Sequence, residues 1–325
     1  MKKEMRYLVP GDYMADPSVH VFNGKLYIYP SHDWESGIPE NDNGDHFNMK
    51  DYHVFSTEDP MQGEIVDHGM VLDTKDIPWA GRQLWDCDVA EKEGKYYMYF
   101  PLKDQNDIFR LGVAIADNPA GPFIPQPDPM KGSYSIDPAV LKDDDGAYYL
   151  YFGGLWGGQL QRYRDNKALE SADLGQADEP AIPARVVRLS DDMLEFAETP
   201  RPVVILDETG QPLKVGDNMR RFFEASWMHK YNGKYYFSYS TGDTHRLCYA
   251  IGDSPYGPFT YQGVILTPVV GWTTHHSIVE YKGKWYLFHH DSVPSGGRTW
   301  LRSLKVCELE YDEQGHILTI DGGGE

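Results

Sequence analysis

One pattern of polar and apolar positions recurs five times along the chain. A polar residue begins a short apolar stretch, a glycine turn follows, and a second stretch rich in aromatic residues comes next. The copy at residues 223–240 is the clearest, because Asn232-Gly233 favours a tight turn with positive φ and residues 235–239 are largely aromatic. Each copy therefore predicts a β-hairpin.

The five hairpins recur at intervals that indicate a repeat architecture. Their turn glycines are Gly24, Gly94, Gly146, Gly233 and Gly283. The two shortest intervals are close to the roughly 40–50 residues of a propeller blade, and the longer ones require insertions. Residues 157–183 form one insertion and predict a long loop or a short helix. Residues 117–123, 190–196 and 253–259 predict turns between the third and fourth strands of a blade.

These repeats predict an all-β protein, a five-bladed β-propeller formed as a single domain by residues 1–325, with no appended β-sandwich. Residues 321–325, which are rich in glycine, predict a flexible tail. Two packed β-domains are the alternative, but no linker-like change in composition marks a boundary between them.

The composition of the chain limits the kinds of molecule that it is expected to bind. The formal net charge of −20 argues against nucleic acid and against anionic membrane surfaces, and it fits a small neutral substrate. No window approaches 18 apolar residues, and the basic start of the chain is not followed by an apolar segment, so we expect a cytoplasmic protein without a membrane span. The three cysteines are too scattered for a disulfide framework or a zinc site.

Chemistry is expected where the first strands of the blades meet. In a propeller these strands run beside the central axis, so equivalent residues form a ring. Counting back from the turn glycines, with a one-residue slip allowed, places five residues in that ring: Asp16, Asp86, Asp137, Glu224 and His275. Any one of them alone is better explained as a strand-start residue, but four carboxylates around one axis repel each other and indicate function. Glu224 is also flanked by apolar residues, which would raise its pKa.

Five motifs in order resemble glycoside hydrolase family 43. They are Ala15-Asp16-Pro17-Ser18, Trp85-Asp86-Cys87-Asp88-Val89, Ser135-Ile136-Asp137-Pro138-Ala139, Phe223-Glu224-Ala225-Ser226 and His275-His276-Ser277-Ile278-Val279. The resemblance extends over residues 7–320. It implies an inverting enzyme on a five-bladed propeller that acts on arabinose- and xylose-containing polysaccharides.

The resemblance also implies roles for three carboxylates. Asp16 would be the general base that activates water, Glu224 the general acid, and Asp137 the residue that orients Glu224 and raises its pKa. Physical chemistry supports this division, since the reaction needs two carboxyl groups in opposite protonation states. Inversion further requires these two groups to stand roughly 6.5–9.5 Å apart, with the water between them.

A metal ion and sugar contacts follow from the same resemblance. His275 matches a histidine that in some members binds Ca²⁺ in the channel. The alternative role for this histidine is a hydrogen bond to channel water. If the register slips by one residue, His276 takes the place of His275.

The candidate substrate-binding residues are His32, Asp33, Trp85, Asp86, Phe223 and Arg302, with Arg298 as the alternative to Arg302. His32 and Asp33 precede an acidic loop at residues 40–45 that would overhang the pocket. Asp86-Cys87 departs from the Ala-Pro that the family commonly has there.

The sequence therefore predicts an exo-acting glycosidase that removes terminal pentose residues from xylo- or arabino-oligosaccharides. Its activity would be that of a β-xylosidase with α-L-arabinofuranosidase activity. An endo-acting arabinanase or xylanase is the first alternative and needs an open groove; a non-catalytic sugar-binding propeller is the second. The sequence leaves the oligomeric state open, a homo-oligomer included.

Overall fold

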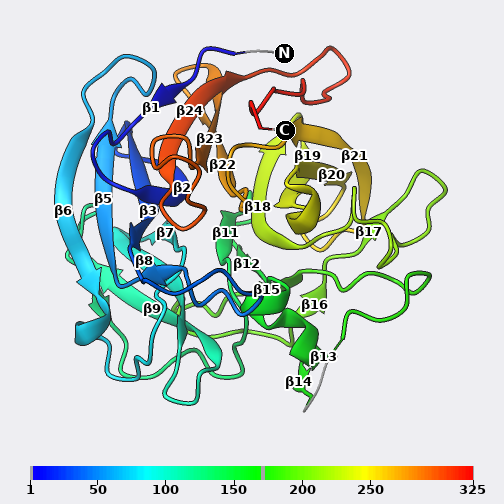
Figure 1. The fold of residues 1–325 in the computed structure, drawn as a ribbon, viewed down its shortest axis with the longest axis horizontal. Helices are drawn as coiled ribbons and strands as arrows, with labels where there is room; N and C mark the ends of the chain where they lie inside the picture. The colour runs from blue at the N-terminus through cyan, green and yellow to red at the C-terminus, as the bar shows by residue number, and fades with distance from the viewer. Residues whose placement is uncertain (1–2, 170–172, 325) are drawn as a thin grey trace.

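Five sheets surround a common axis in the computed structural model, which describes residues 3–169 and 173–324. In Figure 1 the chain colour passes once around the ring, and the last sheet returns beside the first. The innermost strands contact one another in a closed circuit, β2 to β7, β11, β18, β22 and back to β2. The predicted five-bladed propeller is confirmed. No helix in the described part of the chain is long and apolar enough to cross a membrane.

Each blade begins with its innermost strand. The first blade contains β2 (Met14–Phe22), β3 (Lys25–Trp34), β5 (Asp51–Thr57) and β6 (Val66–Asp73), with β4 (Asn48–Met49) paired to β3. The second contains β7 (Asp88–Lys92), β8 (Lys95–Lys103), β9 (Phe109–Ala116) and β10 (Ile124–Pro125). The third contains β11 (Ala139–Lys142), β12 (Tyr148–Phe152), β15 (Arg185–Arg188) and β16 (Arg201–Pro202).

The last two blades add strands from distant parts of the chain. The fourth contains β18 (Glu224–Tyr231), β19 (Lys234–Ser240), β20 (Leu247–Gly252) and β21 (Phe259–Leu266), and β17 (Ile205–Leu206) pairs with β21 in parallel. The fifth contains β22 (His276–Tyr281), β23 (Lys284–Asp291) and β24 (Ser303–Leu309). Its outermost strand is β1 (Arg6–Tyr7), which pairs with β24 and joins the two ends of the propeller.

The predicted hairpin turns have a common backbone geometry in four blades. Asn23, Glu93, Asn232 and Lys282 have φ between 49° and 53°, and the glycine after each has φ between 75° and 78°. Positive φ at both central residues is the type I′ turn, which matches the twist of the flanking strands. The third blade differs, because residues 143–147 form a longer loop between Lys142 and Tyr148.

A tyrosine on the second strand of a blade connects that blade to the next one. Tyr29, Tyr99 and Tyr151 each stand five residues after a turn glycine, and all three are fully buried. Their hydroxyls donate to the backbone carbonyls of Pro119, Met193 and Pro255 at 2.7, 2.8 and 2.6 Å. Those carbonyls belong to the predicted turns 117–123, 190–196 and 253–259. The second set of sequence motifs thus provides acceptors for buried tyrosines, whose hydroxyls need a partner.

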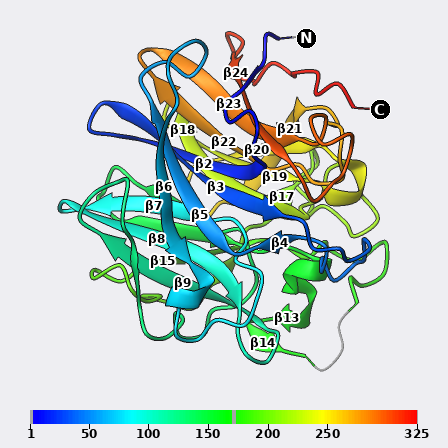
Figure 2. The same cartoon turned by 60° about the vertical axis from the view of Figure 1, so that its left-hand side comes forward.

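Two predicted regions contain further structure within the described residues, which leave out residues 170–172 of the insertion and residue 325 of the tail. The insertion at residues 157–183 holds two 3-10 turns, η2 (Trp156–Gly158) and η3 (Leu160–Arg162), and a small ribbon of β13 (Tyr163–Arg164) and β14 (Lys167–Ala168). Figures 1 and 2 show this ribbon at the end of the molecule opposite the chain termini. The tail is not free through residue 324, because Gly322 and Gly324 donate to Thr267 and Pro268 at 2.9 and 2.8 Å. The remaining short helices are η1 (Thr74–Asp76) and η4 (Gly242–Thr244).

Candidate active site

Irregular backbone at the start of the inner strands aims the carboxylates at the axis. The pairing of β2 with β3 shifts between Ala15 and Ser18, and the pairing of β18 with β19 shifts between Glu224 and Trp227. Asp16 has φ 46° and Asp137 has φ 59°, a region that non-glycine residues seldom adopt. In β18 the corresponding left-handed residue is Ala225, with φ 63°, and Glu224 precedes it. Such strained positions cluster at functional sites.

Asp16 is held beside a buried guanidinium. Arg302 Nη1 donates to Asp16 Oδ1 at 2.8 Å, and the Asp16 backbone N–H donates to His290 Nδ1 at 3.0 Å. Burial alone would raise the pKa of Asp16, but Arg302, His290, His275 and the Ser31 hydroxyl together outweigh it and lower that pKa to about 2. Asp16 is therefore a carboxylate at neutral pH.

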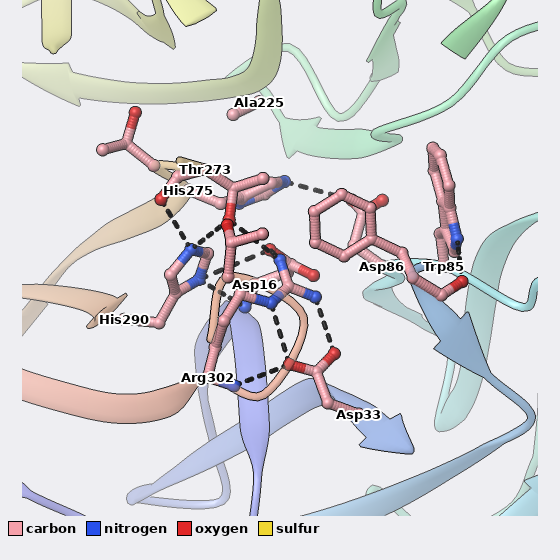
Figure 3. Close-up of polar contacts among 12 residues, drawn as sticks. Asp16, Asp33, Trp85, Asp86, Ala225, Thr273, His275, His290 and Arg302 are labelled. Atoms are coloured by element: carbon pink, nitrogen blue, oxygen red, sulfur yellow. Dashed lines mark hydrogen bonds and ion pairs between the residues drawn. The ribbon is translucent and has the colours of Figure 1, made fainter. Parts of the chain in front are cut away.

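Asp33 fixes the position of Arg302. Its Oδ2 accepts from the Arg302 backbone N–H at 2.9 Å and from Nε at 2.8 Å, and its Oδ1 accepts from Nη2 at 2.7 Å. Figure 3 shows the guanidinium between Asp33 on one side and Asp16 on the other. The Phe47 ring covers Arg302, with its centroid 5.0 Å from the guanidinium carbon. This arrangement leaves Nη1 directed at Asp16.

Glu224 lies in surroundings that oppose its ionisation. Burial raises the pKa of its carboxyl well above the usual value, and the nearby charge of Asp137 raises it further. Asp137 in turn accepts a hydrogen bond from the Ala225 backbone N–H at 2.6 Å, which ties it to the start of β18. Of Asp16 and Glu224, Glu224 is thus the carboxyl whose surroundings favour the protonated form.

Asp86, Asp137 and His275 form a tight group across the axis. His275 Nε2 lies 3.2 Å from Asp86 Oδ2 and 4.0 Å from Asp137 Oδ2. Burial raises the pKa of Asp86 to about 8 and raises that of Asp137 as well, because two adjacent buried carboxylates cannot both ionise without cost. Asp86 Oδ1 and His275 Nε2 are buried without a hydrogen-bond partner. These residues offer two oxygen donors and one nitrogen donor within reach of one ion.

All five ring residues open into one pocket of about 280 Å³. Trp85, Phe223 and Arg302, which the sequence predicts to bind substrate, also line it. Its walls carry further aromatic side chains, including Phe47 and Trp272. One pocket therefore combines an ionised Asp16, a protonated Glu224 and aromatic surfaces.

Comparison with known proteins assigns this arrangement to a family. The family model for glycosyl hydrolases family 43 matches residues 8–317. The chain belongs to glycosyl hydrolase family 43. It is a glycoside hydrolase, and a Bacteroides ovatus protein named xylosidase/arabinosidase is 80% identical to it over the full length of both chains.

Solved structures of family 43 enzymes have the same fold. The structure of the β-xylosidase RS223 has 76% sequence identity and a TM-score of 0.98, and the alignment covers 99% of each chain. A β-xylosidase/α-arabinofuranosidase from a compost microbial metagenome has 62% identity and a TM-score of 0.96, covering 100% of this chain and 99% of that one. That structure is described as a complex with xylotriose in a calcium-free form.

Two residues that the sequence predicts to contact substrate do not line the family 43 pocket. His32 is buried, with Nδ1 3.0 Å from Asp51 Oδ2. Both carboxylate oxygens of Asp33 accept hydrogen bonds from Arg302. Both residues lie on β3 rather than on an innermost strand, so their side chains are directed into the first blade and toward β24. The predictions for these two residues are corrected: Asp33 is a positioning residue, and His32 belongs to a separate cluster.

The alternatives His275 or His276, and Arg302 or Arg298, differ in whether they line the pocket. His275 lines the pocket, whereas His276 is fully buried and contacts Ser238 Oγ through Nε2 at 2.6 Å. Arg302 lines the pocket, whereas Arg298 is exposed and pairs with Glu35 at 3.4 Å. His276 is the first residue of β22 and contacts β19, whereas His275 precedes the strand.

Sequence reasoning missed most of the loop residues that complete the pocket. The 40–44 loop of the first blade lines the pocket, in agreement with the prediction. The sequence did not indicate that Gly157 of η2 packs against this loop. The missed lining residues include His46, Phe47, Ile136, Leu155, Gly157, Gly158, Asp243 and Thr273. They lie in loops without strand periodicity, and the glycines at the start of the insertion, Gly157 and Gly158, are the signal that could have indicated a close approach there.

Proposed function

We propose that this family 43 chain is an exo-acting β-xylosidase, with α-L-arabinofuranosidase activity in the same pocket, that hydrolyses small neutral oligosaccharides with inversion. The observation that carries this proposal is the opposite protonation of Asp16 and Glu224 within one pocket. Glycoside hydrolysis needs one carboxylate and one carboxylic acid on the two sides of the scissile bond. The similar proteins named xylosidase/arabinosidase support the choice of pentose.

In this mechanism Asp16 removes a proton from the attacking water, because Arg302 keeps its carboxylate ionised. Glu224 donates its proton to the oxygen of the leaving sugar. Asp137 raises the pKa of Glu224 and, through the Ala225 N–H, fixes the strand on which Glu224 lies. Each role follows from a contact or charge that the residue has in the folded chain.

Two loops that meet over the pocket support exo action. Gly157 of η2 packs against the 40–44 loop so closely that a Cβ there would lie 2.9 Å from the Asn43 carbonyl oxygen. Both loops line the pocket. A closed pocket admits the end of a chain, whereas endo action requires a groove open at both sides. The endo-acting alternative is therefore not favoured.

Substrate and product profiles test the proposal. Purified protein should hydrolyse aryl β-xylosides and aryl α-L-arabinofuranosides and should release xylose from xylotriose from the earliest times. Internal cleavage of long chains, with oligosaccharides as the first products, would contradict exo action.

Paired variants separate the two carboxyl roles. Glu224→Gln should lose about 10²–10⁴-fold in kcat/KM on xylobiose but far less on an aryl xyloside with an acidic phenol, because that leaving group needs little protonation. Asp16→Asn should lose activity on both substrates. Asp143→Asn, a buried aspartate outside the pocket, is the matched control and should retain activity. Equal losses of Glu224→Gln on the two substrates would contradict its role as the acid.

We also propose that Asp86, Asp137 and His275 bind Ca²⁺. Two carboxylate oxygens suit a hard cation, and water would complete its coordination. The ion would offset the mutual repulsion of the two carboxylates. Calcium should raise the unfolding temperature of the wild-type protein but not that of His275→Gln. An unchanged unfolding temperature in both proteins, with equal activity after chelation and after Ca²⁺ addition, would contradict calcium binding.

A further inference from the structure

A second cluster of metal-ligand type lies in the first blade, outside the pocket. In the described part of the chain, two groups of three His, Cys, Asp or Glu residues have ligand atoms within 4.8 Å of one another. One is the axial group, and the other consists of His32 at the end of β3 with Asp51 and His53 on β5. None of the latter three residues lines the pocket. The proposed reaction does not account for them.

The spacing of these atoms matches a tetrahedral metal site. Asp51 Oδ2 lies 3.0 Å from His32 Nδ1 and 3.5 Å from His53 Nε2. Ligand atoms bound at about 2.0–2.1 Å to a tetrahedral ion stand about 3.3 Å apart, which falls between these two distances. Small movements of the two imidazole rings would therefore admit an ion between His32 Nδ1, His53 Nε2 and Asp51 Oδ2.

The other polar atom of each of the three ligands also faces a polar side chain. His32 Nε2 lies at hydrogen-bond distance, 3.3 Å, from Asp12 Oδ1. His53 Nδ1 lies 3.5 Å from Asp67 Oδ1, within ion-pair distance but without a hydrogen bond. The Trp34 indole N–H donates to Asp51 Oδ1 at 2.7 Å, which leaves Oδ2 for the ion. Carboxylates behind metal-bound histidines fix the tautomer and the ring orientation and are a regular feature of metal sites.

Ligand chemistry and access indicate the class of ion. Two imidazoles and one carboxylate favour Zn²⁺ and similar transition metals, whereas Ca²⁺ prefers a shell of oxygen atoms. The side chains of His32 and Asp51 are buried, but that of His53 is 21% exposed, and Asp12 and Asp67 are largely at the surface. An ion could thus enter past His53, with water as its fourth ligand.

We propose that His32, Asp51 and His53 bind one divalent transition-metal ion of the Zn²⁺ class. The ion joins the end of β3 to the start of β5, and Asp33, which holds Arg302, is the residue next to His32. Its function is to stabilise this part of the first blade rather than to take part in hydrolysis. The competing account is a metal-free group in which both histidines are protonated and share Asp51.

Calorimetric titration with Zn²⁺ tests the proposal and does not depend on activity. His53→Gln should bind one equivalent of Zn²⁺ fewer than the wild-type protein. His68→Gln is the matched control, because His68 is an exposed histidine on the same blade, on β6, and should leave the number of sites unchanged. Because the comparison is a difference between variants, binding of Zn²⁺ to the axial group does not affect it.

Asp67→Asn provides a variant that is expected to fold normally, since its side chain is 55% exposed. Loss of this outer carboxylate should weaken the Zn²⁺ affinity of the site about 10–100-fold. Co²⁺ bound to the wild-type protein should give the visible absorption of a tetrahedral complex, and His53→Gln should lose it. Unchanged stoichiometry in His53→Gln together with unchanged affinity in Asp67→Asn would overturn the proposal in favour of the protonated, metal-free group.

Discussion

At the scale of single residues, Asp16 and Glu224 carry the same functional group in opposite states because their neighbours differ. Arg302 contacts Asp16 directly, whereas Asp137 adds negative charge near Glu224. Asp16 lies on β2 and Glu224 on β18, so the pair exists only after the ring has formed. The reactivity of each carboxyl is set by the side chains that the fold brings beside it.

Asp137→Asn should move the alkaline limb of the kcat/KM profile to lower pH. Glu224 must be protonated to act as the acid, so activity is lost as pH rises through its pKa. Asparagine removes the charge that raises this pKa but can still accept from the Ala225 N–H. The pH profile on xylobiose measures the shift, with Asp143→Asn as control. A lower plateau with an unmoved alkaline limb would contradict the role of Asp137.

The sequence predicted the ring residues better than it predicted their supports. Their positions follow from local spacing to a turn glycine, which the chain shows directly. Asp33 was expected at the substrate, but its partner Arg302 lies 269 residues away, and no local pattern reports that contact. The same reason explains why His32 was placed at the pocket rather than with Asp51 and His53.

At the scale of elements, the bulges in β2 and β18 differ by one residue. Asp16 itself has the left-handed backbone in β2, whereas in β18 that conformation belongs to Ala225 and the acid precedes it. Counting from the turn glycines required a one-residue slip for Glu224, and this difference is its structural cause; the slip for Asp137 comes from the longer loop at residues 143–147. The bulge therefore determines where Glu224 enters the pocket.

Ala225→Val should lower both stability and activity, whereas Ala225→Gly should lower neither strongly. A β-branched residue at φ 63° is strained by about 1–3 kcal/mol, and Ala225 is fully buried, so there is no room for the added methyl groups. Glycine adopts this conformation readily. Urea unfolding and kcat/KM on xylobiose check the pair. Equal stability of the valine and glycine variants would show that the bulge is not under this constraint.

At the scale of the whole molecule, closure of the ring depends on a strand that the sequence did not reveal. The five blades follow from a repeated pattern, but β1 is only two residues long and has no periodicity. Beyond it, Leu8 donates its N–H to the Leu304 carbonyl at 3.0 Å and is buried in a cluster between the first and fifth blades. The start of the chain thus links the first blade to the last.

Leu8→Ala should lower the free energy of unfolding by about 2–5 kcal/mol, because the substitution leaves a cavity between these two blades. Val9→Ala is the control and should cost less, since Val9 is only partly buried. Urea unfolding of both variants gives the comparison. A cost for Leu8→Ala no larger than that for Val9→Ala would contradict this account of ring closure.

The central claim is that Asp16 activates water while Glu224 protonates the leaving sugar, in a single displacement. Proton NMR of the xylose first released from an aryl β-xyloside, recorded before mutarotation, tests it most directly, because all of that xylose comes from the cleaved glycosidic centre. Inversion by these two residues gives α-xylose first from the β-linked substrate. Initial release of β-xylose would mean retention through a covalent intermediate and would contradict the roles assigned to both residues.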